Sequence, residues 1–175
     1  SFGDTNLSAS LFGGSETVKE PRYLMLYYPN RSEVSWKTIV GGDLEISHGA
    51  MTIRGVYLST TAGSKVPDLA LNDSAKLSAY GVAMNLDLDK WFILSEVTQL
   101  ERKFEASAYS YKAPAMTFGV GAHFGEWTPF LNYAQYKESS SDTSKYAPQS
   151  FKRWSFTLKY DVDASSALKA QVDRH

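Results

Sequence analysis

The stretch from Tyr80 to Val97, YGVAMNLDLDKWFILSEV, consists of two runs in which every second residue is apolar, joined by a short polar segment. Side chains alternate between the two faces of a β-strand, so each run has an apolar face and a polar or small face. A two-residue loop at Leu88-Asp89 would bring the two apolar faces to the same side of a hairpin. The pairs predicted on that side are Leu86–Trp91, Met84–Ile93 and Tyr80–Val97.

Three further segments predict hairpins of the same kind. A loop at His48-Gly49 predicts Ile46–Met51, Leu44–Ile53 and Val40–Tyr57 on one face, and Glu45–Thr52 and Asp43–Arg54 on the other. A loop at Gly125-Glu126 predicts Phe124–Trp127, Val120–Leu131 and Phe118–Tyr133. A loop over residues 163–167 predicts Tyr160–Ala170 and Leu158–Val172, with Asp161–Lys169 and Lys159–Gln171 on the opposite face. Because a one-residue slip turns a whole strand over, these four agreements indicate one antiparallel sheet with an apolar face.

The spacing of the strands predicts the fold class. Strands are expected at 7–11, 23–28, 34–47, 50–59, 76–87, 90–100, 115–124, 127–137, 151–162 and 167–173. Short turns near residues 48, 88, 125 and 165 alternate with long polar loops at 60–75, 101–114 and 138–150. This alternation is typical of outer-membrane barrels, which have short periplasmic turns and long external loops. We therefore predict an all-β, antiparallel, up-and-down transmembrane β-barrel, in which residues 1–175 form a single domain or a barrel fragment.

Composition excludes several classes of function. The chain has no cysteine, which rules out disulfides, Cys-ligated zinc and thiol nucleophiles. A net charge of −1 argues against nucleic acid as a partner, since that requires a basic face. No apolar run approaches the ~18 residues of a membrane helix. Aromatic residues make up 14% of the chain, which suits strands and membrane interfaces.

Several stretches resemble Gram-negative outer-membrane porins of the general, trimeric kind. They are residues 91–99, 125–133, 154–162 and 166–174, together with 42–45 and 53–57. The resemblance implies a passive diffusion channel for small hydrophilic solutes in the cell outer membrane. It also implies contacts with the lipid bilayer and lipopolysaccharide, and a homo-oligomer, the trimer. Such porins have about sixteen strands and usually end in an aromatic residue, whereas this chain offers about nine or ten strands and stops at Arg174-His175. We therefore expect it to be the later part of a larger barrel.

The polar face supplies the candidate pore-lining residues. They are Lys37, Asp43, Glu45, Arg54, Glu96, Lys159, Asp161, Lys169 and Asp173. One interpretation is a charged, water-filled lumen that filters solutes by size and field; the other is the solvated outer face of a soluble sheet.

No motif indicates catalysis, a metal or a cofactor. The three histidines are scattered, and no G-x-S-x-G elbow is present. The alternative to a porin is a soluble β-barrel or sandwich that binds a sugar or lipid through Trp and Tyr; an outer-membrane barrel enzyme is a third option. The direction of the aromatic side chains distinguishes the first two. Aromatics that point outward into lipid support a porin, and aromatics clustered in one cleft support a binding module.

Overall fold

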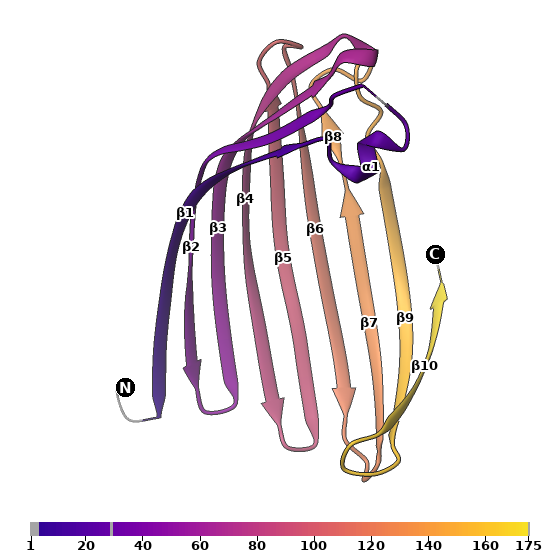
Figure 1. Ribbon diagram of the computed structural model, residues 1–175. Helices are drawn as coiled ribbons and strands as arrows, with labels where there is room; N and C mark the ends of the chain where they lie inside the picture. Colours follow the sequence, from indigo (N-terminus) through magenta and orange to yellow (C-terminus); the bar gives the residue numbers. More distant parts are fainter. Residues whose placement is uncertain (1–3, 29, 175) are drawn as a thin grey trace.

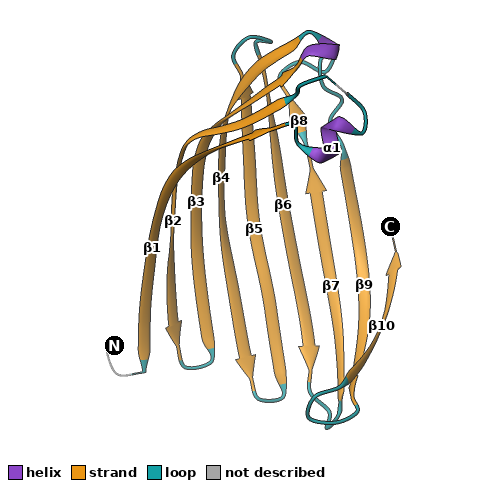
Figure 2. Cartoon of the chain, in the orientation of Figure 1, coloured by secondary structure: helices purple, strands orange, loops and turns teal. Residues whose placement is uncertain are grey.

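The computed structural model describes residues 4–28 and 30–174, which form one antiparallel sheet (Figures 1 and 2). The long strands are β1 (Thr5–Lys19), β2 (Glu33–His48), β3 (Met51–Val66), β4 (Leu71–Leu88), β5 (Trp91–Phe104), β6 (Tyr109–Ala122), β7 (Trp127–Lys137), β9 (Ser150–Asp161) and β10 (Ala167–Arg174). They lie side by side in chain order, and the two-residue strand β8 (Ser139–Ser140) pairs with β6. Within the described residues β1 and β10 form the two edges and do not pair with each other. The predicted all-β, up-and-down architecture is confirmed.

Two predicted long loops are largely strand. β3 and β4 continue through most of 60–75 and are joined by the short 3-10 helix η1 (Pro67–Leu69), and β5 and β6 continue through most of 101–114. The polar composition of these segments predicted loops. In the structure their backbone is extended and pairs with the neighbouring strands. In Figure 1 the upper ends of β1 to β4 bend over toward one side of the sheet. The predicted loop at 138–150 remains, apart from β8.

The predicted strand at 23–28 is wrong. This segment contains the short helix α1 (Arg22–Met25), which follows Pro21 at the N-cap position. A short run of apolar residues cannot distinguish a strand from a helix by periodicity, because no alternation is present. No helix in the described part of the chain is both long enough and apolar enough to cross a bilayer.

The predicted faces of the hairpins are right, but three of the four registers are wrong by two residues. The Phe118–Tyr133 hairpin has the predicted register. In two of the other three the partner lies two residues further from the turn than predicted, so that Ile46 faces Ile53 and Leu86 faces Ile93. In the last hairpin it lies two residues nearer, so that Leu158 faces Ala170. A shift of the turn by one residue moves the register by two and keeps every side chain on its face. The alternation in the sequence therefore determines the face but leaves the exact partner open.

A β-bulge interrupts β2. The pairing of β2 with β3 shifts between Lys37 and Val40, and Thr38 has a φ of 53°. The Thr60 hydroxyl donates a hydrogen bond of 3.1 Å to the Lys37 carbonyl beside the bulge. An extra residue on one strand reverses the alternation beyond it. The segment Glu33–Lys37 therefore presents its odd-numbered residues to the face that carries even-numbered residues in the rest of β2.

The two faces of the sheet differ in burial. We call the face of Asp43 and Arg54 the inner face and that of Leu44 and Ile53 the outer face; the ladders of paired residues carry this division across all nine long strands. The buried residues of the inner face include Thr60, Val66, Ala75, Leu77, Ala113 and Ser155. The sheet thus curls over its inner face, and large apolar residues of the outer face stay exposed.

Candidate pore-lining face

Eight of the nine predicted pore-lining residues lie on the inner face. The ladders place Asp43, Glu45, Arg54, Glu96, Lys159, Asp161, Lys169 and Asp173 there. The prediction for Lys37 is wrong, because it pairs with Thr61, which shares the outer face with Ile53 and Tyr57. The physical reason for this error is the bulge at Thr38, which simple alternation along β2 does not reveal.

The first group of charges lies on β2 and β3. Arg54 is directly opposite Glu45, and one terminal nitrogen of its guanidinium lies 3.2 Å from a carboxylate oxygen of Asp43 on the diagonal. The Arg54 side chain is 55% exposed, whereas that of Asp43 is 15% exposed. The predicted pairing of Asp43 with Arg54 thus exists as a diagonal ion pair. Its cationic end is open to whatever fills the concave side.

A second group crosses the middle of the sheet. One transverse row on the inner face runs from Arg54 through Ala83, Glu96, Thr117 and Ala134 to Arg153. Glu96, Thr117 and Arg153 also line a depression of ≈ 270 Å³. Small residues between the charged ones leave this row open, so cationic and anionic side chains face the same space.

Arg102 and Arg153 are inner-face residues that the sequence analysis missed. Arg102 lies in phase with Glu96 on β5, and Arg153 lies in phase with Lys159 on β9. The alternation was therefore a sufficient signal for Arg153, while Arg102 lay beyond the predicted end of its strand. The Nε atoms of both arginines are buried and have no hydrogen-bond partner among the described residues. The Arg102 guanidinium lies over the Tyr111 ring, 5.9 Å from its centroid.

A third group of charges lies on β9 and β10. The Lys159 ammonium is 2.7 Å from a carboxylate oxygen of Asp161, two residues along the same strand. The predicted cross-strand pairs Asp161–Lys169 and Lys159–Gln171 are wrong, because the register is shifted and Lys169 faces Lys159 directly. Directly opposed like charges repel. Asp161 offsets this by pairing with Lys159, and on β10 Gln171 donates a hydrogen bond of 2.8 Å to Asp173.

The inner face is not uniformly polar. The rings of Phe92 and Phe130 stack 5.6 Å apart, and they lie over Gly121 and Gly119, where a Cβ atom would overlap them. Nearer to the long-loop end of this face, an apolar depression of ≈ 480 Å³ is lined mainly by Val56, Leu58, Leu100, Tyr111 and Tyr136. Strict apolar-out, polar-in alternation thus describes the charged rows but not the whole concave side.

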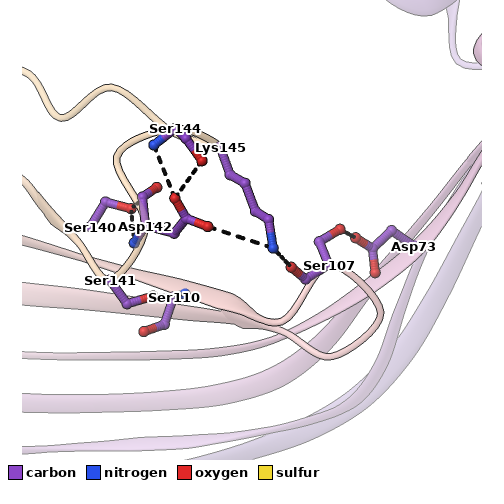
Figure 3. Close-up of polar contacts among 8 residues, drawn as sticks. All are labelled: Asp73, Ser107, Ser110, Ser140, Ser141, Asp142, Ser144 and Lys145. Atoms are coloured by element: carbon purple, nitrogen blue, oxygen red, sulfur yellow. Dashed lines mark hydrogen bonds and ion pairs between the residues drawn. The ribbon is translucent and has the colours of Figure 1, made fainter.

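Hydrogen bonds tie the loops together at the end of the sheet opposite the tight turns (Figure 3). The Ser107 hydroxyl donates to Asp73, and the Lys145 ammonium donates to the Ser107 carbonyl at 2.6 Å. Lys145 also forms an ion pair of 3.6 Å with Asp142, and Ser141 accepts a hydrogen bond from the Ser110 backbone. Three segments distant in sequence therefore form one connected rim.

Glu138 anchors the loop that joins β7 to β9. It is 9% exposed and accepts hydrogen bonds from the hydroxyls of Tyr136 and Tyr146 and from the Gln149 backbone. The bond from Tyr136, with those from Gln149 and Tyr146, holds the pKa of Glu138 below its ordinary value. The hydrogen bond that Tyr146 donates to Glu138 raises the pKa of Tyr146 to about 12, because the carboxylate favours the protonated hydroxyl. The Tyr146 ring stacks on Tyr111 of β6 at 4.6 Å, which fixes the loop to the sheet.

The outer face carries a continuous apolar band. On β4 the outer positions from Tyr80 to Leu88 are all apolar, a distance of about 27 Å along a strand. Bands of about 25 Å with aromatic borders are the lipid-facing surface of outer-membrane barrels. The exposed aromatic residues on the strands of this band include Tyr57, Tyr80, Trp91, Phe118, Trp127, Trp154 and Phe156. Beyond the band the outer face carries polar residues, such as Lys76, Glu101 and Lys112.

Solved structures share this architecture. OmpT of Vibrio cholerae, an outer membrane protein folded in vitro and seen in a trimer form, matches 92% of this chain with a TM-score of 0.65. The chain has the fold of an outer-membrane β-barrel. Its identity to OmpT is 8%, and the match covers 53% of OmpT.

Two further solved structures match the chain. A loop L8 deletion mutant of OmpT matches 95% of this chain with a TM-score of 0.64 at 6% identity, and 56% of its own length is covered. The chain therefore spans about half the length of the OmpT structures that it matches. The CymD monoaromatic hydrocarbon channel has a TM-score of 0.44 and 11% identity, with 97% of this chain and 64% of CymD covered. No protein-family model and no curated protein matches the sequence.

Proposed function

We propose that this chain forms part of the wall of an outer-membrane porin through which small hydrophilic solutes diffuse. The observation that carries the proposal is the division of one curved sheet into two unlike faces. Trp91, Trp127 and Trp154 are 55%, 46% and 52% exposed on the outer face, while Asp43, Arg54 and Glu96 share the inner face. Exposed tryptophans bordering an apolar band suit lipid, and charges on the concave side suit water.

The inner charges would act on solutes through their field. Anionic and cationic side chains stand on the same transverse row, as Glu96 and Arg153 do, so a passing solute meets both signs. Filtering by size and charge needs no reacting side chain. We accordingly propose that the protein is not an enzyme. Its partners in this proposal are the bilayer with its lipopolysaccharide, the permeating solutes and further copies of the protein in a trimer.

The arrangement of the aromatic residues favours a porin over a soluble binding module. A module that binds a sugar would gather Trp and Tyr in one concave cleft. Here the aromatics of the outer band are spread over six strands, β3 to β7 and β9, and point away from the concave side. Such a spread surface matches a lipid layer better than a single ligand.

The test is single-channel recording of the full protein, purified from membranes in detergent, in a planar bilayer with symmetric KCl. The proposal predicts steady, ohmic conductance steps and fractionation with outer membranes. A protein that is freely soluble without detergent and gives no conductance steps would refute it.

A further inference from the structure

Two depressions of the inner face form one hollow. The apolar depression of ≈ 480 Å³ covers the row of Val56, and the depression of ≈ 270 Å³ covers the next row toward the tight turns, which carries Glu96 and Arg153. The residues that line both depressions are Thr98, Ala115 and Tyr136. The hollow is therefore apolar toward the long loops and charged toward the tight turns.

Glu96 and Arg153 face this hollow without a partner in the protein. Among the described residues neither side chain forms an ion pair or a hydrogen bond, and the Nε atom of Arg153 is buried without an acceptor. The two residues are three strand spacings apart on their row, about 14 Å between Cα atoms. Thr117 and Ala134 between them are small, so both long side chains can lean inward and reach one short ligand.

This pair of unlike charges fits a zwitterion. A ligand with only a carboxylate would bind Arg153 but would be repelled by Glu96, and a ligand with only an ammonium group would meet the reverse situation. A ligand that carries both groups forms a charge-assisted hydrogen bond at each end and leaves neither residue unpaired. Arg54, on the same row, is already paired with Asp43.

Tyr111 and Tyr136 form an aromatic wall at the apolar end of the hollow. The Tyr136 hydroxyl donates a hydrogen bond to Glu138, and its ring stacks on Phe151 with 5.4 Å between the centroids. The Tyr111 ring stacks on Tyr146 at 4.6 Å. Both rings are therefore held in place before a ligand arrives. A ligand ring that packs against them restricts few additional side-chain rotations, which favours binding.

The shape of the apolar end favours a ring over an acyl chain. Its remaining lining is aliphatic, with Val56 and Leu58 on β3 and Leu100 on β5. Val56 and Leu58 occupy neighbouring rows, which lie about 7 Å apart along the strand. A hollow of this length accepts one ring system, whereas an extended acyl chain needs a longer groove. Its volume also lies within the range of about 300–1,000 Å³ that is usual for small-molecule sites.

We propose that this hollow is a retention site for aromatic α-amino acids, which it selects among the solutes of the channel. The ligand carboxylate binds the terminal nitrogens of Arg153, the ammonium group binds Glu96, and the ring packs against Tyr136 at the apolar end. This inference rests on the proposed function, because the inner face must be filled with water and open to solutes.

The experiment is saturation-transfer NMR of the full protein in detergent, with dissociation constants obtained by ligand titration. The probes are phenylalanine and three molecules that each lack one of its groups: 3-phenylpropionate lacks the ammonium group, phenethylamine lacks the carboxylate, and alanine lacks the ring. The charge variants are Arg153→Gln and Glu96→Gln. Val56→Thr adds a hydroxyl to the apolar end at nearly the same volume and at an exposed position. The matched control is Lys152→Gln, which removes the cation next to Arg153 from the outer face of β9.

We expect the wild type and Lys152→Gln to bind phenylalanine with a Kd on the order of 1 mM, because a passing solute must also leave. Arg153→Gln and Glu96→Gln should each weaken this binding about tenfold, the loss of one charged hydrogen bond. Val56→Thr should weaken phenylalanine binding about threefold and leave that of alanine unchanged. Phenylalanine has no net charge, so a general change in the field of the lumen would not produce losses in both charge variants.

Three results would overturn the proposal: equal affinity for phenylalanine and alanine, tighter binding of 3-phenylpropionate or phenethylamine than of phenylalanine, and unchanged affinity in both charge variants. Absence of binding to the full protein would overturn it too, and would indicate that another segment of a longer chain covers the hollow. Single-channel conductance, recorded in parallel, separates the two claims. A channel that conducts but binds no phenylalanine refutes the site alone, and a protein that binds phenylalanine without conducting refutes the porin alone.

Discussion

An arginine scan along the outer face of β4 would test whether this face contacts lipid. The outer positions are Ser78, Tyr80, Val82, Met84, Leu86 and Leu88. Met84 lies four residues from both Tyr80 and Leu88, about 13 Å from each border of the apolar band. An arginine at the midplane of a lipid-facing barrel costs about 2–4 kcal/mol, and one near the interface costs about 0–1 kcal/mol.

The expected result is a profile of destabilisation that peaks at Met84→Arg and falls toward Ser78→Arg and Leu88→Arg. Val82→Arg is the most informative single variant, because Val82 is 56% exposed. At an exposed site of a water-soluble protein such a change is worth within about 0.5 kcal/mol, whereas in lipid it should cost about 2 kcal/mol or more. The matched control is Ala83→Arg, the next residue on β4, whose side chain points to the inner face between Arg54 and Glu96.

The assay is urea unfolding of the protein folded into phosphatidylcholine vesicles, followed by tryptophan fluorescence, with free energies of unfolding from linear extrapolation. Ala83→Arg should stay close to the wild type. A flat profile along β4, or a larger loss at Ala83 than at Val82, would show that the outer face does not contact lipid.

Three further predictions concern single groups of residues. Reversing Asp43 and Asp161 to Lys should shift the reversal potential in a salt gradient toward anion permeability and leave strand content unchanged, since a cross-strand pair of opposite charges such as Asp43–Arg54 contributes about 0.2–1 kcal/mol. Glu33→Lys on the outer face is the control, and an unshifted potential would place both aspartates off the conducting path. Gly41→Ala should destabilise the protein by about 1–3 kcal/mol, because its Cβ overlaps the Phe12 ring and the Tyr57 carbonyl. Gly55→Ala should stabilise it by about 0.4–1 kcal/mol, because a Cβ there meets nothing within 4 Å and the unfolded chain loses freedom. Urea unfolding measures both variants, and equal effects would contradict the described packing. The contribution of Glu138 to loop stability should be present above its unfolded pKa and lost as pH falls through its lowered folded pKa. The contribution of Tyr146 should be lost as pH rises toward about 12. Backbone NMR shifts of residues 138–149 should therefore change at both extremes of pH in the wild type, and the change at acid pH should disappear in Glu138→Gln.

The sequence predicted the sheet because alternation is repeated in every hairpin. It determined which residues share a face, and eight of nine candidate pore-lining residues lie on the inner face for that reason. It could not determine the register, because Ile46 can face either Met51 or Ile53 without exposing an apolar residue to the wrong side. The error at Lys37 has a different cause. Its position depends on the left-handed backbone of Thr38, and threonine carries no signal for that conformation.

The apolar depression of the inner face was also beyond the sequence. It arises from residues brought together across several strands, and it does not form a pattern along one strand. Val56 and Leu58, for example, are in phase with Arg54 on β3, so alternation alone marks them as neighbours of charged residues. The Glu138 anchor likewise depends on Tyr136, Tyr146 and Gln149, which meet only because the loop folds back.

The bulge in β2 decides which face each residue beyond it occupies. Thr38 and Ile39 together oppose Thr60, so deleting one of them would remove the bulge and leave Lys37 opposite Thr61 on the outer face. Regular pairing through both residues would instead exchange the faces of every residue from Glu33 to Lys37. Lys37 would then move to the concave side, and Trp36 would move to the side of the aromatic band. Related barrels that keep both residues but lack the bulge would therefore differ in the charge of their inner face without any substitution among their charged residues.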